Sequence, residues 1–183
     1  MKTFRDYILE NKNQFEGVKL RLAEMPLRIP EMPRDKVVKD INSFWEIAKD
    51  ENPTVVGKIG SEEVIRVGNS SIRYFFILKN DKPIFFIGLD KRMDLSGWQV
   101  TYAAKTNSET SYKKFLKFIL RNQTLGVVCG NEQTPSAERF WKKILKDPKC
   151  QWDAFDDNTG KHVEVKDVDQ AWDTDTVFRI LKY

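Results

Sequence analysis

The chain has 183 residues, of which 40% are hydrophobic and 12% aromatic, enough to bury one sizeable core and too much for a disordered chain. Its 31 Lys and Arg nearly balance its 27 Asp and Glu, so the formal net charge of +4 gives only a mild preference for anions and argues against a nucleic-acid partner. Because no apolar run is long enough to span a bilayer, the sequence also predicts no membrane partner.

The cysteines and the single histidine are widely separated. Cys129 and Cys150 have no CxxC spacing, and His162 is the only histidine, so no zinc site is predicted and both thiols are expected to be free. The opening residues carry charge where a secretory signal is apolar. Together these features predict that the protein is located in a reducing, cytoplasmic compartment.

The first 33 residues are predicted to form a helix and a proline-rich tether, followed by a single domain over residues 34–183. Apolar side chains at helical spacing within residues 3–12 predict a short helix with Thr3 as its N-cap. The segment EMPLRIPEMP at residues 24–33 holds three prolines, each of which fixes φ and removes a backbone donor. We therefore expect this segment to be extended.

Residues 34–50 have apolar side chains at helical spacing and predict an amphipathic helix. The period then changes to that of strands, which are predicted at residues 55–59, 64–67, 72–79 and 83–90. Tight-turn signals at Gly68-Asn69 and Asn80-Asp81 indicate an antiparallel meander. The aromatic residues on its last two strands are predicted to form a buried sheet face, with a base-stacking platform as the alternative.

The rest of the chain predicts alternating strands and helices, then closing strands. Residues 98–105 predict a strand, 111–121 a helix and 125–129 a short buried strand. Thr134-Pro135 marks another helix start, because the hydroxyl can cap it and proline suits the first helical position. Closing strands are predicted at residues 151–155, 162–165 and 177–181. This order predicts an α+β fold with a mixed, mostly antiparallel sheet flanked by helices on both faces.

The order of these elements resembles the GNAT family, the acetyl-coenzyme-A-dependent N-acetyltransferases. The segment GNEQTPSAERFWKKILKDP, Gly130 to Pro148, is similar in particular to divergent GNAT-like proteins of tailed bacteriophages. The resemblance implies a GNAT-like fold, acetyl-CoA as cofactor, and a location in the host cytoplasm or the virion. The tripeptides at residues 8–10 and 22–24 also match the pattern at which such phages cut head proteins, with an ordinary amphipathic helix as the alternative.

The resemblance also implies where acetyl-CoA would bind. In the family, the pantetheine arm pairs with the fourth strand and the pyrophosphate sits in the glycine-rich loop that follows it. The implied cofactor-binding residues are Val100, Thr101, Tyr102 and Ala103 on the strand, Lys105, Ser108, Thr110 and Ser111 at the loop, and Asn131 before the next helix. The loop here lacks glycine and carries Glu109, although Lys113 and Lys114 add compensating charge. The alternative is that Ser108 or Thr110 only caps a solvated helix.

Catalytic roles are implied on the same basis. Many family members protonate the leaving thiolate with a tyrosine on the helix after the fifth strand. The matching residue here is Trp141, whose indole cannot act as a general acid. Tyr102 or Tyr112 is the substitute that the sequence offers, although an aromatic residue at either place also suits a core. Glu132 or Asp94 is the candidate general base, each in a predicted loop.

Two functions are consistent with these residues. The first is transfer of an acetyl group from acetyl-CoA to an amine, with the CoA thioester and the amine acceptor as partners. The alternative is a non-catalytic GNAT-like phage protein that acts as a virion component or binds a phage or host protein, because the loop glycines and the tyrosine acid are both missing. The first function requires strands 98–105 and 125–129 to run side by side, diverge at their tips and leave a cleft.

Overall fold

The computed structural model describes residues 27–28, 33–106, 111–122, 124–129 and 132–183. The predicted N-terminal helix and both phage-type tripeptides lie outside the described residues. Within the predicted tether, Leu27–Arg28 forms a short strand, β1, which pairs in parallel with Glu132–Gln133, β8. Among the described residues, no helix combines the length and the apolar character needed to cross a membrane.

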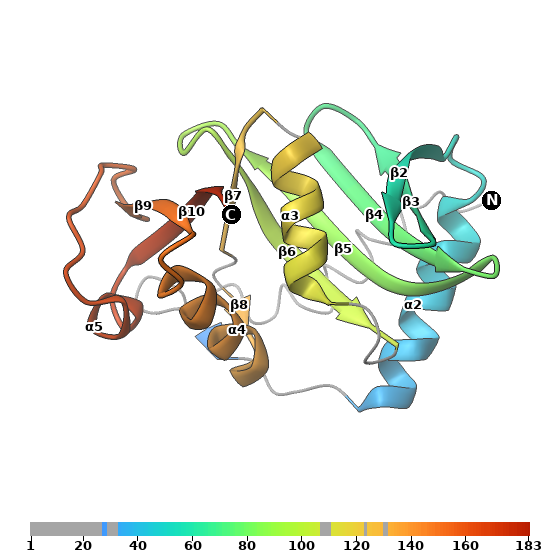
Figure 1. Ribbon diagram of the computed structural model, residues 1–183, viewed down its shortest axis with the longest axis horizontal. Helices are drawn as coiled ribbons and strands as arrows, with labels where there is room; N and C mark the ends of the chain where they lie inside the picture. Colours follow the sequence, from blue (N-terminus) through green and yellow to red (C-terminus); the bar gives the residue numbers. More distant parts are fainter. Residues whose placement is uncertain (1–26, 29–32, 107–110, 123, 130–131) are drawn as a thin grey trace.

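The fold is built on an eight-stranded sheet. Its strands are β2 (Thr54–Ile59), β3 (Glu62–Gly68), β4 (Ile72–Lys79), β5 (Lys82–Arg92), β6 (Gly97–Lys105), β7 (Gly126–Val128), β9 (Gln151–Asp156) and β10 (Thr176–Lys182). Their order is β2-β3-β4-β5-β6-β7-β10-β9, and only β6 and β7 are parallel neighbours (Figure 1). The described helices are α2 (Arg34–Ala48), α3 (Tyr112–Asn122), α4 (Pro135–Leu145) and α5 (Val168–Trp172). The predicted α+β class and mostly antiparallel sheet are confirmed.

Local turn chemistry determines the first half of the sheet. Asn80 and Asp81 have φ angles of 51° and 60°, as a two-residue type I′ hairpin requires, and they join β4 to β5. At the preceding turn, Asn69 Oδ1 accepts hydrogen bonds from the backbone N–H groups of Ser71 and Ile72. The predicted meander over β2 to β5 is confirmed.

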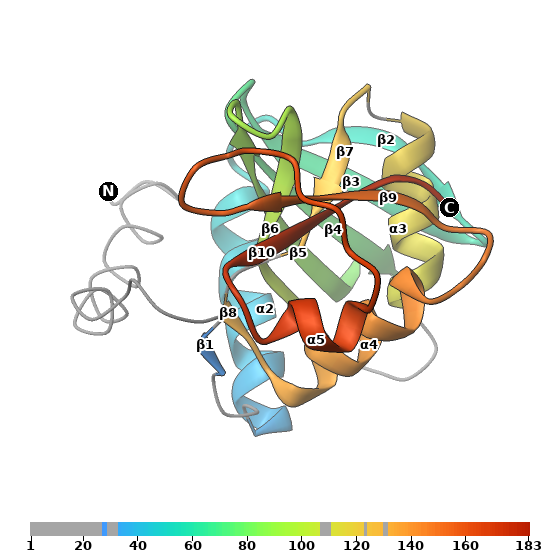
Figure 2. The same ribbon diagram turned by 90° about the vertical axis from the view of Figure 1, so that its left-hand side faces the viewer.

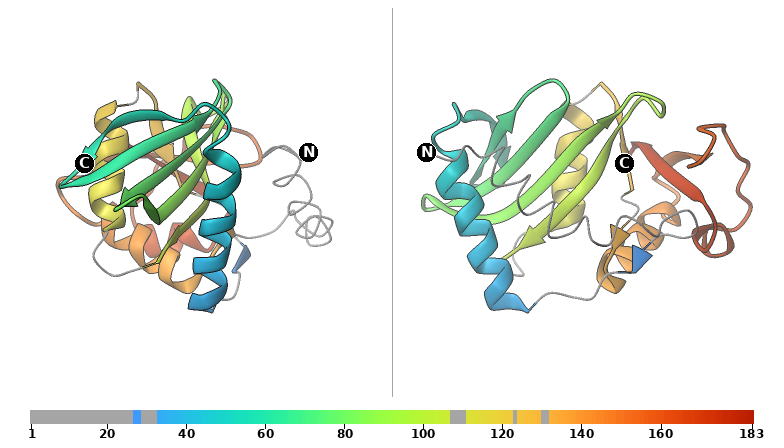
Figure 3. Two further views of the ribbon diagram at one scale, coloured as in Figure 1. Left: turned by 90° about the vertical axis from the view of Figure 1, so that its right-hand side faces the viewer. Right: turned by 180° about the vertical axis from the view of Figure 1, so that it is seen from behind.

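Two apolar clusters lie on opposite sides of the sheet. Phe85 and Phe86 are neighbours on β5 and therefore point to opposite faces. Phe86 stacks on Phe44 of α2, with ring centroids 4.9 Å apart, whereas Phe85 packs on Phe115 of α3 at 4.8 Å. α2 and α3 accordingly lie on different sides of the sheet in Figure 3. The phenylalanines of β4 and β5 are buried core and do not form an exposed stacking platform.

The chain after β9 differs from the prediction. Residues 162–165 are not a strand, because the chain makes a single bridge from His162 to Phe155 and then leaves the sheet. Asp167 then accepts hydrogen bonds from two backbone N–H groups of α5 and so starts that helix. The predicted strand is therefore replaced by an extended connection to a short helix that the sequence analysis did not predict.

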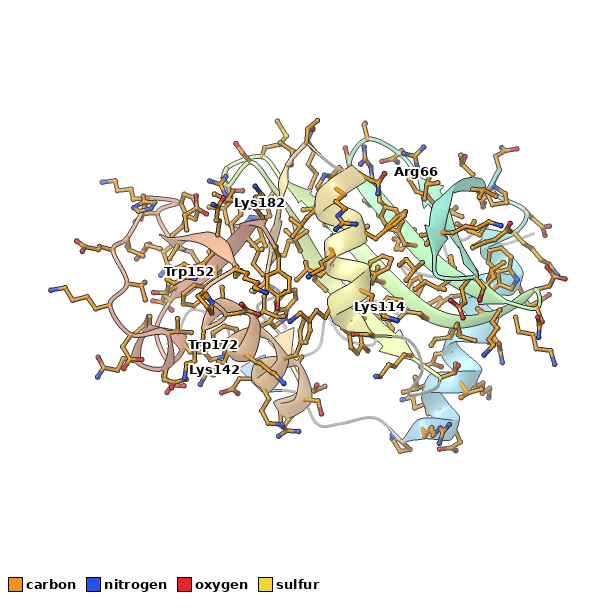
Figure 4. The ribbon with its side chains drawn as sticks, in the orientation of Figure 1. Arg66, Lys114, Lys142, Trp152, Trp172 and Lys182 are labelled. Atoms are coloured by element: carbon orange, nitrogen blue, oxygen red, sulfur yellow. The ribbon has the colours of Figure 1, made fainter. Side chains whose placement is uncertain are left out.

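α5 packs against β10 at the end of the sheet formed by β9 and β10. Trp172 of α5 stacks on Phe178 of β10 with ring centroids 5.4 Å apart, and Trp152 of β9 meets the same ring edge-on at 5.5 Å. Lys142 of α4 lies 5.7 Å from the centroid of the Trp172 ring. These contacts hold α4 beside β9 and β10 (Figures 2 and 4).

Candidate functional site

β6 and β7 pair through only three residue pairs, which begin with Gly97 opposite Gly126. Glycine is needed in both strands because there is no room for a side chain. A Cβ on Gly97 would lie 2.5 Å from a methyl carbon of Val128, and one on Gly126 would lie 2.8 Å from the carbonyl oxygen of Ile180. Beyond this joint β6 continues to Lys105 while β7 ends, and the strands diverge (Figure 1). All three residues of β7 pair with β6, and we call the place where β7 ends and β6 continues the divergence of the two strands.

A cavity of about 540 Å³ lies at this divergence, within the size range of small-molecule sites. The sheet residues that line it are Ile87, Leu89, Val100, Thr101, Tyr102, Ala103, Ala104, Lys105 and Val127. The remaining lining residues belong to α2, α3 and α4 with its cap, and they are Arg34, Val37, Tyr112, Phe115, Leu116, Ile119, Thr134, Ser136, Ala137, Phe140 and Trp141. The lining is mostly apolar, and its only charged members among the described residues are the cations Arg34 and Lys105.

Most of the described residues predicted to bind the cofactor lie on this cavity. Those that line it are Val100, Thr101, Tyr102, Ala103 and Lys105, and the predicted catalytic Tyr112 lines it too. Ser111 stands just before α3, where its carbonyl oxygen accepts from the Phe115 N–H at 3.1 Å. Glu132 lies in β8, where its backbone pairs with Leu27. Ser108, Glu109, Thr110 and Asn131 lie outside the described residues.

β6 has an irregular edge beside the cavity. The register with β5 shifts by one residue at Thr101, which therefore forms a β-bulge. Gly88 on β5 makes room for it, because a Cβ there would lie 3.1 Å from Thr101 Oγ1. On its other edge, no described strand pairs with β6 beyond the joint with β7. The backbone N–H and C=O groups of that edge are therefore placed to bond a ligand in the cavity.

Tyr102 extends from β6 toward α2. Its ring centroid lies 5.9 Å from that of Phe44 and 5.5 Å from that of Phe86. Its hydroxyl is buried and has no hydrogen-bond partner among the described residues. Burial, with a smaller contribution from the charge of Asp40, raises the pKa of Tyr102 to about 12. The hydroxyl therefore keeps its proton at neutral pH and has a hydrogen bond left to donate.

The loop end of β6 carries the positive charge of the cavity. Lys105 Nζ lies 5.3 Å from the centroid of the Tyr112 ring, which packs on Phe85 and Phe140. From the first turn of α2, Arg34 Nη2 donates to the carbonyl oxygen of Thr106 at 3.0 Å. Two cations thus stand where β6 ends and α3 is about to begin, an arrangement that favours the anionic end of a ligand. Lys114 points outward from α3 (Figure 4).

The remaining predicted catalytic positions have defined surroundings. Trp141 is 6% exposed and packs edge-on against Phe140 in the wall of the cavity. It forms part of the wall and leaves the cavity open. Asp94 lies in the turn between β5 and β6 and does not line the cavity. Its carboxylate accepts hydrogen bonds from Arg92, which lower its pKa and make it a weaker base.

Thiol and metal chemistry have no counterpart in the described structure. Cys129 and Cys150 are free, as predicted. Burial raises the pKa of Cys129 well above its usual value, so this thiol stays protonated and inert. Within the part of the chain that the structure describes, no three His, Cys, Asp or Glu side chains gather as a metal site would require.

α2 contributes site residues that the sequence analysis did not assign. Arg34 and Val37 reach the cavity from the first turn of that helix. The amphipathic pattern predicts the helix but not which end of it meets β6, so no local signal identifies these residues. Comparison with protein-family models finds no match, and no curated protein matches the chain in sequence. We therefore argue function from the cavity and its walls.

Proposed function

We propose that the chain is a GNAT-like acyltransferase that moves an acetyl group from acetyl-CoA to an amine. The cavity at the divergence of β6 and β7 carries this proposal, because it combines an open strand edge with a cationic end. The contacts of α2 and α3 with opposite faces of the sheet support a GNAT-like layering. The single parallel pair within an otherwise antiparallel sheet supports it as well.

The residues of β6 suit the arm of the cofactor. The backbone from Val100 to Ala103 would bond the amide groups of the pantetheine arm, as one strand bonds another. Lys105 and Arg34 would face the pyrophosphate, with Ser111 and the proposed ligands Ser108, Thr110 and Asn131 completing that end. Because the described cations stand at one end only, they favour a single direction for the arm along β6.

The chemistry requires positioning and two proton transfers. When bound, acetyl-CoA supplies a thioester whose carbonyl carbon accepts the amine nitrogen, so that a C–N bond forms, the C–S bond breaks, and the amine proton ends on the CoA thiol. Tyr102 keeps its proton at neutral pH and can donate a hydrogen bond to the departing sulfur. Tyr112, the other candidate that the sequence offered, packs beside Lys105 and so belongs to the pyrophosphate end of the cavity. Glu132 is the proposed base for the amine.

A non-catalytic GNAT-like phage protein, acting as a virion component or binding a host protein, is the second candidate. One observation favours it: Trp141 occupies the wall where the family has its acid, and an indole cannot protonate a thiolate. The two candidates differ in a measurable way, because only the acyltransferase needs to bind a CoA thioester.

Calorimetric titration of the full chain with acetyl-CoA tests the proposal. We expect one site per chain, and at a hundredfold excess over Kd the ligand should stabilise the fold by about 2.7 kcal/mol in a thermal-shift measurement. Ala137→Trp, which fills the cavity from α4, should abolish binding, whereas Lys143→Trp, at an exposed position of the same helix, should not. Lys105→Glu should weaken acetyl-CoA binding because it reverses the charge that faces the pyrophosphate, and it does so without filling the cavity. Absence of heat and of thermal shift at millimolar acetyl-CoA would exclude the enzyme and leave the non-catalytic candidate.

A further inference from the structure

The charges of the chain are distributed unevenly over the two sides of the sheet. The charged residues of α2, on one side, balance one another, and they are Arg34, Lys36 and Lys39 against Asp35, Asp40 and Glu46. α3, on the other side, carries no acidic residue, and its charged residues are Lys113, Lys114, Lys117 and Arg121. The near balance of charge in the whole chain therefore conceals a local excess of positive charge on the α3 side.

Two more cations border α3. Arg66 of β3 pairs with Phe75 of β4, and directly opposite residues of an antiparallel pair point to the same face. Phe75 packs on Phe115 of α3, with ring centroids 5.8 Å apart, so Arg66 also points to the α3 side. Figure 4 shows Arg66 and Lys182 on either side of α3. We call the following six residues the basic face: Arg66, Lys113, Lys114, Lys117, Arg121 and Lys182.

Most of the positive charge on the basic face has no acidic partner. Lys113 is the one member that forms an ion pair among the described residues, with Asp147 at 3.3 Å. The Nζ atoms of Lys113 and Lys117 lie 4.7 and 4.8 Å from the centroid of the Tyr183 ring, which keeps the two ammonium groups close together and does not neutralise them. The exposed members of the basic face are Lys113, Lys114, Arg121 and Lys182.

The surroundings of these cations favour a nucleic-acid duplex over an acidic protein. Lys113, Lys117 and Arg121 recur every four residues and so follow one side of α3 in steps of about 6 Å, a regular series that suits the phosphates of a backbone. A protein partner needs exposed apolar anchors, yet α3 contains none of the exposed large apolar residues of the described structure, which are Val55, Met93 and Leu181. Single strands are bound by stacking on exposed aromatic rings, and no aromatic residue is exposed in the described part of the chain.

We infer that the basic face binds the phosphate backbone of double-stranded nucleic acid without reading its sequence. α3 spans about 16 Å, and over that length a duplex carries on the order of nine phosphates, enough to supply one for each cation of the basic face. Such contacts position a protein on a duplex but carry no sequence information. No member of the basic face lines the cavity between β6 and α4, so the inference does not depend on the proposed function.

The test is a titration of labelled duplexes of about 20 base pairs with the full chain, followed by fluorescence anisotropy at several salt concentrations. With about five phosphate contacts, the logarithm of the association constant should fall against the logarithm of the salt concentration with a slope of about −4.5. Two DNA duplexes of unrelated sequence should bind equally, and single-stranded DNA of the same length should bind more weakly. A duplex RNA is measured beside them. Binding of either kind of duplex supports the inference, and the tighter one identifies the preferred nucleic acid.

Variants that remove charge locate the binding surface. Lys114→Gln combined with Arg121→Gln removes two cations from the basic face, so the salt slope should become shallower by about two and binding at about 0.1 M salt should weaken at least tenfold. The matched control is Lys36→Gln combined with Lys39→Gln, which removes the same charge from exposed positions of α2 and should leave slope and affinity nearly unchanged. Circular dichroism confirms that each variant is folded.

Several results would overturn the inference. If neither duplex binds saturably at about 50 mM salt, the basic face is an ordinary solvated surface. If both double variants weaken binding equally, the affinity comes from the net charge of the chain and not from the basic face. If polyglutamate binds as tightly as the duplexes, the surface suits an acidic protein and the assignment to nucleic acid is refuted. Each of these results is independent of whether acetyl-CoA binds, so the acyltransferase proposal is tested separately.

Discussion

Tyr102 and Tyr183 show two environments of a phenol hydroxyl in this fold. The Tyr183 hydroxyl donates to Asp147 Oδ2 at 2.6 Å, whereas the Tyr102 hydroxyl is buried without a described partner. A buried polar group with no hydrogen bond destabilises the fold. Tyr102 nevertheless has such a hydroxyl beside the cavity, which is expected if the hydroxyl donates a hydrogen bond to a bound ligand.

Tyr102→Phe should therefore separate stability from activity. We expect the free energy of unfolding in urea to stay unchanged or to rise by up to about 1 kcal/mol, because no hydrogen bond is lost. Acetyl transfer should slow on the order of a hundredfold, because the departing sulfur loses its donor. Tyr74→Phe, on β4 and outside the cavity lining, is the matched control and should leave the transfer rate unchanged. A Tyr102→Phe variant of full activity would refute the assigned role.

Asp147 gives the fold a defined pH dependence. The hydrogen bond from the Tyr183 hydroxyl, helped by the Lys149 N–H and by Lys113, lowers the pKa of Asp147 to about 2. In an unfolded chain this pKa is about 3.9. Because the folded pKa is the lower one, the ionised carboxylate stabilises the fold above about pH 4, and this contribution disappears as the pH falls through about 2.

The corresponding prediction concerns Asp147→Asn. The difference in unfolding free energy between the natural chain and this variant should be full at pH 7 and should shrink between pH 4 and pH 2. Urea titrations at several pH values measure it, with Asp81→Asn at the exposed β4–β5 turn as the control. A difference that does not change with pH would contradict the account of Asp147.

At the scale of elements, the joint between β6 and β7 depends on Gly126. A Cβ there would lie 2.7 Å from Arg179 Cγ and 2.8 Å from the Ile180 carbonyl oxygen, and the backbone atom cannot move aside. Gly126→Ala should therefore destabilise the fold by about 1–3 kcal/mol, seen as a lower urea midpoint. Gly160→Asn is the control: its φ of 65° suits asparagine, and nothing lies within 4 Å of the new Cβ. An unchanged midpoint for Gly126→Ala would show that the joint tolerates a wider spacing.

The start of α4 depends on its cap. Thr134 Oγ1 accepts from the Ala137 N–H at 3.2 Å, and Pro135 occupies the first helical position. Thr134→Ala should cost about 1 kcal/mol of unfolding free energy, and Thr134→Ser should restore most of it because the hydroxyl remains. Thermal unfolding of both variants measures the effect. Equal loss in the two variants would assign the stabilisation to the methyl group and not to the cap.

The sequence predicts correctly the elements that are determined by interactions between residues close together in the chain. Asn80-Asp81 specifies a hairpin and Thr134 a helix start through bonds made within a few residues, and both are confirmed. The strand predicted at residues 162–165 is not formed, because a strand depends on a partner and here the chain leaves the sheet and leads into α5. Arg34 and the bulge at Thr101 could not be predicted, because both depend on how separate elements meet across the sheet.

At the scale of the whole molecule, one structural feature organises the fold. The sheet is antiparallel on both sides of a single parallel pair, and that pair separates after three residues. Apolar clusters under α2 and under α3 hold the two faces of the sheet, so the opening between β6 and β7 is supported from both sides. The divergence is thus bordered by packed elements on both faces of the sheet.

An NMR titration of the isotopically labelled chain with coenzyme A tests the central claim most directly. The account predicts saturable shifts in the backbone amide signals of Val100 to Lys105 and of Tyr112, which face the cavity, and unchanged signals for β2 and β3 at the far edge of the sheet. No shifts at millimolar coenzyme A, or shifts confined to strands other than β6, would contradict the claim that the divergence of β6 and β7 is the binding site.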